Sequence, residues 1–275
     1  MRNAWLATSK QKTRLFLRRR FGVEVVRVAS DPRDAETLLA LRLDQLFSRC
    51  GVDLVLDVGA QVGNYAAFLR RNGYTGRIIS FEPVSATYQV LAQRAAGDPQ
   101  WQAVKVALGA EDGEAELNVT KSSVFSSFFA PNAYALREWG SGAEVDRVER
   151  VAIRRLDTLL PELVGHDRVA SVFLKMDTQG WDLEVLRGAS GVAGDIVAIQ
   201  SEVSVLPIYG GMPSLDQSLD AFRELGFSVA GLFPVGYDSN NRVVEFDCLC
   251  IADPKEARPP AGDPQSSPRG ERHRA

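Results

Sequence analysis

Residues 52–64, V-D-L-V-L-D-V-G-A-Q-V-G-N, combine an apolar run, an acid and small residues in an order that predicts a strand, a turn and a helix start. The aliphatic run 54–56 is typical of a strand buried on both faces, and Asp57 ends it. Helical spacing begins at Asn64, so we expect the turn at a helix amino terminus, where backbone N–H groups favour a polar ligand. Three small residues let this turn bend and approach the ligand closely: Gly59, Ala60 and Gly63.

The glycine spacing distinguishes two kinds of nucleotide-binding loop. A dinucleotide loop needs G-x-G-x-x-G, whereas G-A-Q-V-G is one glycine short. With Asp57 two positions earlier, D-V-G-A-x-x-G resembles motif I of the S-adenosylmethionine (SAM) methyltransferases, whose loop holds the amino acid end of the cofactor. We therefore favour SAM and keep an NAD(P)-dependent oxidoreductase of Rossmann type as the alternative. That alternative lacks a Tyr-x-x-x-Lys pair in this sequence.

Composition limits the class of protein. The chain has 275 residues, of which 45% are hydrophobic, enough for one sizeable core. A net charge of -3 gives no indication of a nucleic-acid partner. Cys50, Cys248 and Cys250 do not form a disulfide framework, and we expect buried, reduced thiols in a cytoplasmic protein. No apolar run approaches the ~20 residues of a membrane span.

The chain divides into three predicted parts. Residues 1–30 form a basic amino-terminal appendage, residues 31–253 one domain, and residues 254–275 a disordered tail rich in Pro, Arg, Gly and Ser. The appendage is either a helix that packs on the domain or an amphipathic helix that contacts an anionic membrane surface. Its basic residues are Lys10, Lys12, Arg14, Arg18, Arg19 and Arg20.

Strands and helices alternate after residue 52, which predicts a doubly wound sheet with ligands at the carboxyl ends of its strands. The later strands are expected at residues 77–81, 101–108, 148–153, 171–176 and 196–200. Residues 114–120 look like a hairpin partner of the third strand. An antiparallel pair, 227–232 and 243–251, ends the domain, so we expect a mixed sheet.

Two strand ends complete an expected nucleoside site. Glu82 follows the second strand, close to the ~20-residue spacing at which dinucleotide folds place a ribose-binding acid after the loop. Its two oxygens can accept hydrogen bonds from both ribose hydroxyls, and Pro83 opens the next helix. The third strand is expected to end at Ala107 and Leu108, as an apolar wall for adenine. The alternative is a surface glutamate before a helix.

Five sequence blocks together resemble the FkbM family of methyltransferases. They are L-D-V-G-A-x-x-G-N, F-E-P, R-L-D-T-L, L-K-M-D-T-Q-G-W-D with V-L-R-G, and Q-S-E, within residues 52–251. The resemblance implies a class I SAM methyltransferase (Rossmann-like) fold, a seven-stranded mixed sheet with an antiparallel C-terminal hairpin. It also implies an O-methyltransferase acting on hydroxyls of sugars, glycolipids or related natural products. Gln179 stands where many members carry Glu, and its effect is left open.

Methyl transfer to an alcohol requires a group that takes the hydroxyl proton. His166 lies in a polar turn and His273 in the tail, so a histidine base is not expected. We expect Asp177 as base, Glu202 beside it on the neighbouring strand, and Lys175 on the same strand face to hold Asp177 ionised or orient the acceptor. Asp177 and Glu202 could instead bind one Mg²⁺, or the three residues could form a structural ion-pair cluster. A non-catalytic SAM-binding partner protein is a further alternative.

A serine- and phenylalanine-rich stretch within residues 121–149 is expected as a lid over the reacting group or as a surface excursion. Serines would hydrogen-bond sugar hydroxyls, and aromatic rings would pack on sugar or lipid faces. Its residues are Ser122, Ser123, Phe125, Ser126, Ser127, Phe128 and Phe129. Residues 209–212, Y-G-G-M, are a second candidate for acceptor contacts.

Overall fold

The structure is a computed structural model that describes residues 33–165 and 169–254. The predicted appendage, residues 1–30, both histidines and nearly all of the predicted tail lie outside these ranges, so these domain boundaries stay predictions. Within the described ranges, no helix is long and apolar enough to cross a membrane.

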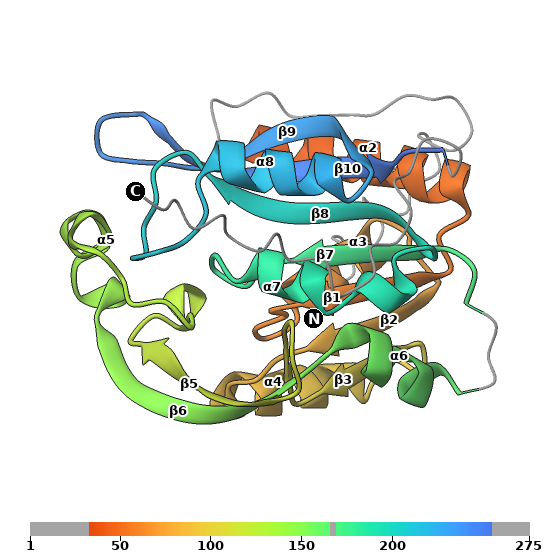
Figure 1. Ribbon diagram of the computed structural model, residues 1–275, viewed down its shortest axis with the longest axis horizontal. Helices are drawn as coiled ribbons and strands as arrows, with labels where there is room; N and C mark the ends of the chain where they lie inside the picture. The colour runs from red at the N-terminus through yellow and green to blue at the C-terminus, as the bar shows by residue number, and fades with distance from the viewer. Residues whose placement is uncertain (1–32, 166–168, 255–275) are drawn as a thin grey trace, which may run out of the picture.

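Seven strands form the main sheet, and their order confirms the predicted fold class (Figure 1). Strands β3, β2, β1, β7 and β8 are parallel to one another, whereas β10 is antiparallel to β8 and to β9. In sheet order they are β3 (Trp101–Val104), β2 (Arg77–Phe81), β1 (Leu54–Val58), β7 (Val172–Met176), β8 (Ile196–Ser204), β10 (Val243–Ala252) and β9 (Phe227–Tyr237).

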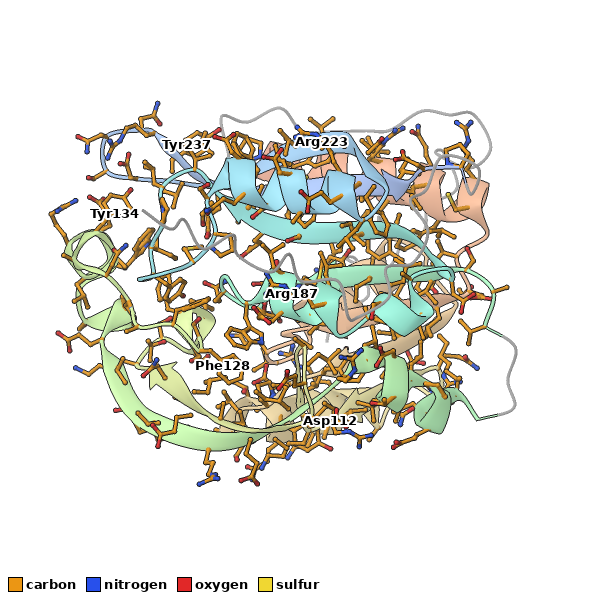
Figure 2. All side chains as sticks on the ribbon, viewed as in Figure 1. Asp112, Phe128, Tyr134, Arg187, Arg223 and Tyr237 are labelled. Atoms are coloured by element: carbon orange, nitrogen blue, oxygen red, sulfur yellow. The ribbon has the colours of Figure 1, made fainter. Side chains whose placement is uncertain are left out.

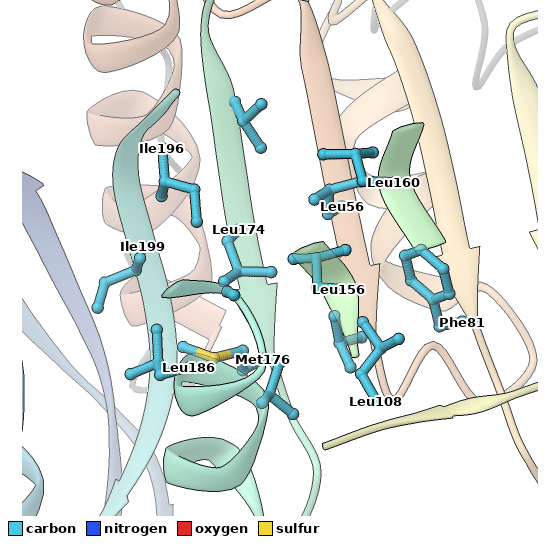
Figure 3. Close-up of a cluster of buried hydrophobic side chains, with 14 of the residues drawn as sticks. Leu56, Phe81, Leu108, Leu156, Leu160, Leu174, Met176, Leu186, Ile196 and Ile199 are labelled. Carbon is cyan, nitrogen blue, oxygen red and sulfur yellow. The ribbon is translucent and has the colours of Figure 1, made fainter. Parts of the chain in front are cut away.

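Both faces of the sheet are covered, which explains the continuous apolar runs of its central strands. Leu54 and Leu56 of β1 face the helices α6 (Leu156–Val164), α7 (Asp182–Arg187) and α8 (Leu215–Glu224). Figure 3 shows this core, in which Leu56 lies near Leu160 and beside Leu174 of the neighbouring strand. Val55 faces the opposite layer, formed by α2 (Arg33–Cys50) and α3 (Asn64–Arg71). Helix α4 (Ser85–Ala95) packs beside β3.

A second, three-stranded sheet corrects part of the sequence prediction. The third strand of the main sheet ends at Val104, because the chain turns tightly through a hydrogen bond from Val106 N to Val104 O. The next residues form β4 (Ala107–Leu108), which pairs with β6 (Val145–Arg154). Strand β5 (Gly113–Thr120) is also paired with β6, and not with the third strand as predicted. In Figure 1, β5 and β6 curve along the lower left of the molecule.

The connection between β5 and β6 is less irregular than predicted. It contains α5 (Ala133–Trp139) and two short 3-10 turns, Ser123–Phe125 and Gly140–Ala143. Strand β8 is longer than predicted and reaches Ser204, because β10 pairs with it along this length. Glu202 therefore lies inside β8 and not at its end. The three thiols are free; Cys248 and Cys250 are buried, as predicted, whereas Cys50 is only partly buried.

Candidate active site

A cavity of about 280 Å³ lies at the carboxyl ends of the parallel strands. It crosses β2, β1, β7 and β8, and its outer walls come from the second sheet and from residues 122–129, which we call the lid. Its lining is mixed: Glu82 lies beside the apolar residues Val106, Ala107 and Leu108 near β2 and β4, and Asp177, Gln179 and Glu202 lie toward β7 and β8. The predicted site residues found in this lining are Gly59, Glu82, Pro83, Ala107, Leu108, Asp177 and Glu202.

The glycines of the first loop are required by protein packing. A Cβ on Gly59, where φ is +75°, would lie 1.9 Å from the carbonyl oxygen of Asp177. A Cβ on Gly63, where φ is +84°, would lie 2.7 Å from the ring of Trp101. Gly59 still borders the cavity, whereas Gly63 does not. The close approach predicted toward a ligand is thus an approach of the loop to β7 and β3.

Two further loop residues predicted to bind the cofactor also lie outside the cavity lining. Ala60 is buried, and its N–H donates to the carbonyl oxygen of Phe81 at 3.0 Å. The side-chain oxygen of Asn64 accepts from Arg94 Nη1 at 3.0 Å, on the surface of α3. These contacts fix the loop against β2 and α4.

Glu82 is held by three donors at one end of the cavity. Its Oε2 accepts from the N–H of Gln61 at 2.8 Å, and its Oε1 accepts from the N–H of Val84 at 2.8 Å and from Thr87 Oγ1 at 2.9 Å. Burial raises the pKa of Glu82 against the opposing effect of these donors. Carboxylate oxygens have further lone pairs, so the site fits a pair of ribose hydroxyls beside the apolar wall of Val106, Ala107 and Leu108.

Asp57 does not border the cavity, because its side chain is buried within the sheet. Its Oδ2 accepts from Ser80 Oγ at 3.0 Å, and its Oδ1 lies 3.5 Å from Lys175 Nζ. Lys175 Nζ also lies 3.0 Å from Asp177 Oδ2 and 5.1 Å from the centre of the Tyr65 ring. Burial acts to lower the pKa of Lys175, but the charges of Asp177 and Asp57 outweigh it and raise the pKa.

The position of Lys175 distinguishes between its two predicted roles, holding Asp177 ionised and orienting the acceptor. The side chain is 6% exposed and lies outside the cavity lining, so it does not orient an acceptor. Lys175 lies between Asp57 of β1 and Asp177, which follows β7. Its charge lowers the pKa of Asp177 against the effect of burial. Lys175 is thus a positioning residue for Asp177.

Gln179 connects the two acids at the other end of the cavity. Its Nε2 donates to Asp177 Oδ1 at 2.9 Å and to Glu202 Oε2 at 3.0 Å. Burial and the charges of Asp177, Glu245 and Asp247 raise the pKa of Glu202 well above its ordinary value. Because the pKa of Asp177 is lowered, Asp177 is the ionised member of the pair at neutral pH.

The same amide argues against the predicted metal site. An N–H group, and not a space for a cation, stands between the carboxylates of Asp177 and Glu202. In the part of the chain that the structure describes, no group of three or more His, Cys, Asp or Glu side chains is arranged to hold a metal ion. The residues present therefore do not fit Mg²⁺.

Residues 209–212 were predicted to contact the acceptor, but they are not in the cavity lining. They pack instead against the loop of Gln179 and Gly180. The Tyr209 hydroxyl lies 2.8 Å from Gln179 Oε1, and Tyr209 is buried. Met212 packs against Gly180. Ser127 Oγ donates to the carbonyl oxygen of Gln179 at 2.8 Å, which connects the lid to the same loop. These bonds hold Gln179 at a φ of +56°, which is unusual for a residue with a side chain.

The lid residues divide between the cavity and the protein interior. Ser123, Ser126, Ser127 and Phe128 border the cavity, whereas Ser122, Phe125 and Phe129 do not. The Phe125 ring packs against Trp139 at 5.4 Å between ring centres, and the Phe129 ring packs against Trp181 at 5.7 Å. The structure therefore separates lining residues from anchors that the sequence treated alike.

Several lining residues were not predicted. Gln61 lies in the quoted loop and has a φ of +50°, but a positive φ at glutamine has no sequence signal. Trp181 lies four residues after Asp177, directly after Gln179 and Gly180. Its closeness in sequence to the predicted base could have marked it as a lining residue. Leu117 lies on β5, whose long-range pairing with β6 a single sequence does not show.

Known proteins resemble this chain in sequence and in fold. The AMB antimetabolite synthetase AmbE of Pseudomonas aeruginosa is 27% identical over 184 residues, which cover 55% of this chain and 8% of that protein. The chain thus spans a small part of the length of this curated relative. A solved FkbM methyltransferase from Methylobacillus flagellatus KT is 16% identical, with a TM-score of 0.43 over 72% of this chain and 43% of that chain.

A magnesium protoporphyrin IX methyltransferase from Synechocystis PCC 6803, solved with bound SAM, is 12% identical, with a TM-score of 0.44 over 90% of this chain and 91% of that chain. The family model of the methyltransferase FkbM domain matches residues 57–229, more than half of the chain. The matched region includes Asp57, Glu82, Asp177 and Glu202. The chain belongs to the FkbM methyltransferase family.

Proposed function

We propose that this protein is a SAM-dependent O-methyltransferase that methylates a hydroxyl of a sugar, glycolipid or related natural product. The order of polar groups along the cavity is the observation that carries the proposal. Glu82 lies at the end of β2, Gly59 at the end of β1, and Asp177 at the end of β7. A carboxylate suited to ribose hydroxyls and a pair of acidic residues thus lie in one cavity, at the carboxyl ends of the parallel strands.

The residues of the cavity fit the parts of SAM. Glu82 would hold the ribose hydroxyls, and Val84, Ala107 and Leu108 would contact the base. The amino acid part would lie past Gly59, toward Asp177. Membership of the FkbM methyltransferase family supports SAM as the ligand of this cavity.

The protein's own groups would perform three tasks. SAM, when bound, supplies a methyl group activated by its sulfonium. The acceptor hydroxyl would gain this methyl group and lose its proton, which the ionised carboxylate of Asp177 would take. Gln179 and Lys175 hold that carboxylate in place, and the lid residues Ser127 and Phe128 cover the cavity and exclude water.

The charge of the cavity supports an uncharged acceptor. Its lining contains the carboxyl groups of Glu82, Asp177 and Glu202, and no Lys, Arg or His among the described residues. An anionic acceptor would therefore meet the ionised carboxylate of Asp177, with no cation in the cavity lining to bind it. Ser123 and Ser126 offer hydroxyls for sugar-type hydrogen bonds. A glycolipid acceptor would in addition use the basic residues 1–30, which the structure does not describe.

The test is methyl transfer from labelled SAM to sugar and glycolipid extracts. We expect a labelled product that resists mild alkali, as an ether does and an ester does not. Asp177→Asn should abolish turnover and leave the affinity for S-adenosylhomocysteine (SAH) within about threefold. Full turnover in this variant would contradict the assignment of the base. Binding of NAD in place of SAH would favour the oxidoreductase, and SAH binding without turnover on any extract would favour a non-catalytic partner protein.

A further inference from the structure

The lid places an aromatic wall on the nucleoside side of the cavity. Phe128 and Trp181 both border the cavity, and their ring centres lie 4.7 Å apart. Phe128 also packs on the cluster that contains Val84, Ala107 and Leu117. Figure 2 shows Phe128 in the region between β5 and the layer of α7. The ring therefore belongs to the apolar end of the cavity and not to the acidic end at Asp177.

We propose that Phe128, backed by Trp181, covers the adenine of bound SAM, so that the lid binds the cofactor and not only the acceptor. This inference rests on the proposed function. Adenine is a flat aromatic group, and a base in a protein site is commonly stacked on an aromatic side chain. The lining beside Phe128 is apolar, with Val106, Ala107 and Leu108 available to contact the base.

The position of Phe128 is fixed by its neighbours before any ligand binds. Ser127 exchanges two backbone hydrogen bonds with Asn118 of β5, at 2.9 and 3.1 Å. Ser127 Oγ donates to the carbonyl oxygen of Gln179 at 2.8 Å and accepts from the N–H of Phe129 at 3.0 Å. Because the lid is held on both sides of the cavity, little ordering of Phe128 is needed on binding. Its contribution should therefore appear as affinity.

The chain offers a matched control within the same lid. Phe125 is also a lid phenylalanine, but it packs against Trp139 and does not border the cavity. We expect Phe128→Ala to weaken SAH binding about 5- to 150-fold, the range seen when an aromatic partner of a stacked base is removed. The affinity for adenosine should fall by a similar factor, since adenosine carries the same base. Phe125→Ala should change both affinities by less than about threefold. Phe128→Trp, which keeps an aromatic ring at this position, should retain most of the wild-type affinity.

Isothermal titration calorimetry with SAH and with adenosine measures these affinities, and thermal unfolding checks that each variant is folded. Equal affinity for SAH in wild type and Phe128→Ala would overturn the inference and leave the proposed function standing. Equal losses in Phe125→Ala and Phe128→Ala would also overturn it, because they would indicate a loosened lid. No binding of SAH by the wild-type protein would overturn the proposed function and this inference together.

A second readout locates the base without relying on affinity. Adenine stacked near a tryptophan quenches the fluorescence of the indole, so SAH should quench the tryptophan emission of the wild-type protein. Trp181→Phe should remove most of this quenching, whereas Trp139→Phe should retain it, because Trp139 lies outside the cavity lining. Quenching that survives in Trp181→Phe would place the base elsewhere and contradict the proposal.

Discussion

Replacing Lys175 by methionine leaves two carboxylates without their cation, and we expect it to destabilise the protein. Lys175 Nζ lies 3.0 Å from Asp177 Oδ2 and 3.5 Å from Asp57 Oδ1. Removing one partner of a buried ion pair costs about 3–5 kcal/mol. The Asp57 side chain is 0% exposed but that of Asp177 is 31% exposed, so we expect the lower end of this range, about 3 kcal/mol at pH 7.

The pH dependence of this loss follows from the pKa directions. Lys175 lowers the pKa of Asp177 and opposes the rise that burial causes in Asp57. Without Lys175 both pKa values should lie above the unfolded value of about 3.9. The folded variant then binds more protons than its unfolded chain between pH 7 and pH 5, so its free energy of unfolding increases as the pH falls. The difference in free energy of unfolding between the wild-type protein and Lys175→Met should therefore be smaller at pH 5 than at pH 7.

Urea unfolding followed by circular dichroism at pH 7 and pH 5 measures both effects. Lys105→Met is the matched control, because Lys105 is exposed, and it should change stability by less than about 0.5 kcal/mol. A loss of stability below about 1 kcal/mol in Lys175→Met at pH 7, or an equal loss at both pH values, would show that Lys175 does not neutralise the two carboxylates.

Three further predictions concern the same site. Gly59→Ala should lower the free energy of unfolding by at least about 4 kcal/mol or prevent folding, because the new Cβ would overlap the carbonyl oxygen of Asp177. The control is Gly113→Ala, where a Cβ would have nothing within 4 Å. In the same urea assay it should change the free energy of unfolding by less than about 1 kcal/mol. Tyr209→Phe leaves Gln179 Oε1 without its donor and should cost about 1–3 kcal/mol in thermal unfolding, with turnover reduced more than SAH affinity; an unchanged melting temperature would argue against this bond. EDTA should leave SAH binding and turnover unchanged, and activity restored by Mg²⁺ after EDTA would contradict the assignment of Gln179 between the carboxylates.

The sequence predicted those parts of the site that follow from local pattern. An apolar run followed by Asp57 and Gly59 is sufficient to place β1 and its turn. Parallel topology then brings the residues after each strand to one edge, which places Glu82 and Asp177 in the same cavity. These inferences needed only strand positions and their direction.

The remaining parts depend on contacts between distant residues. Gly63 was predicted to serve a ligand, but Trp101 packs where its side chain would lie. Ala107 and Leu108 were assigned to the main sheet, because an apolar pattern does not show that the chain turns at Val106 and pairs with β6. The amide bridge of Gln179 depends on its neighbours in space, and these were not available from a single sequence.

Calorimetric titration with SAH measures whether the cavity between Glu82 and Asp177 binds SAM. We predict one binding site in the wild-type protein, and an affinity at least about tenfold lower in Glu82→Ala, which loses the charged acceptor for the ribose hydroxyls. Thermal unfolding should show that this variant remains folded. No binding of SAH, or the same affinity in both proteins, would show that this cavity does not bind SAM through Glu82.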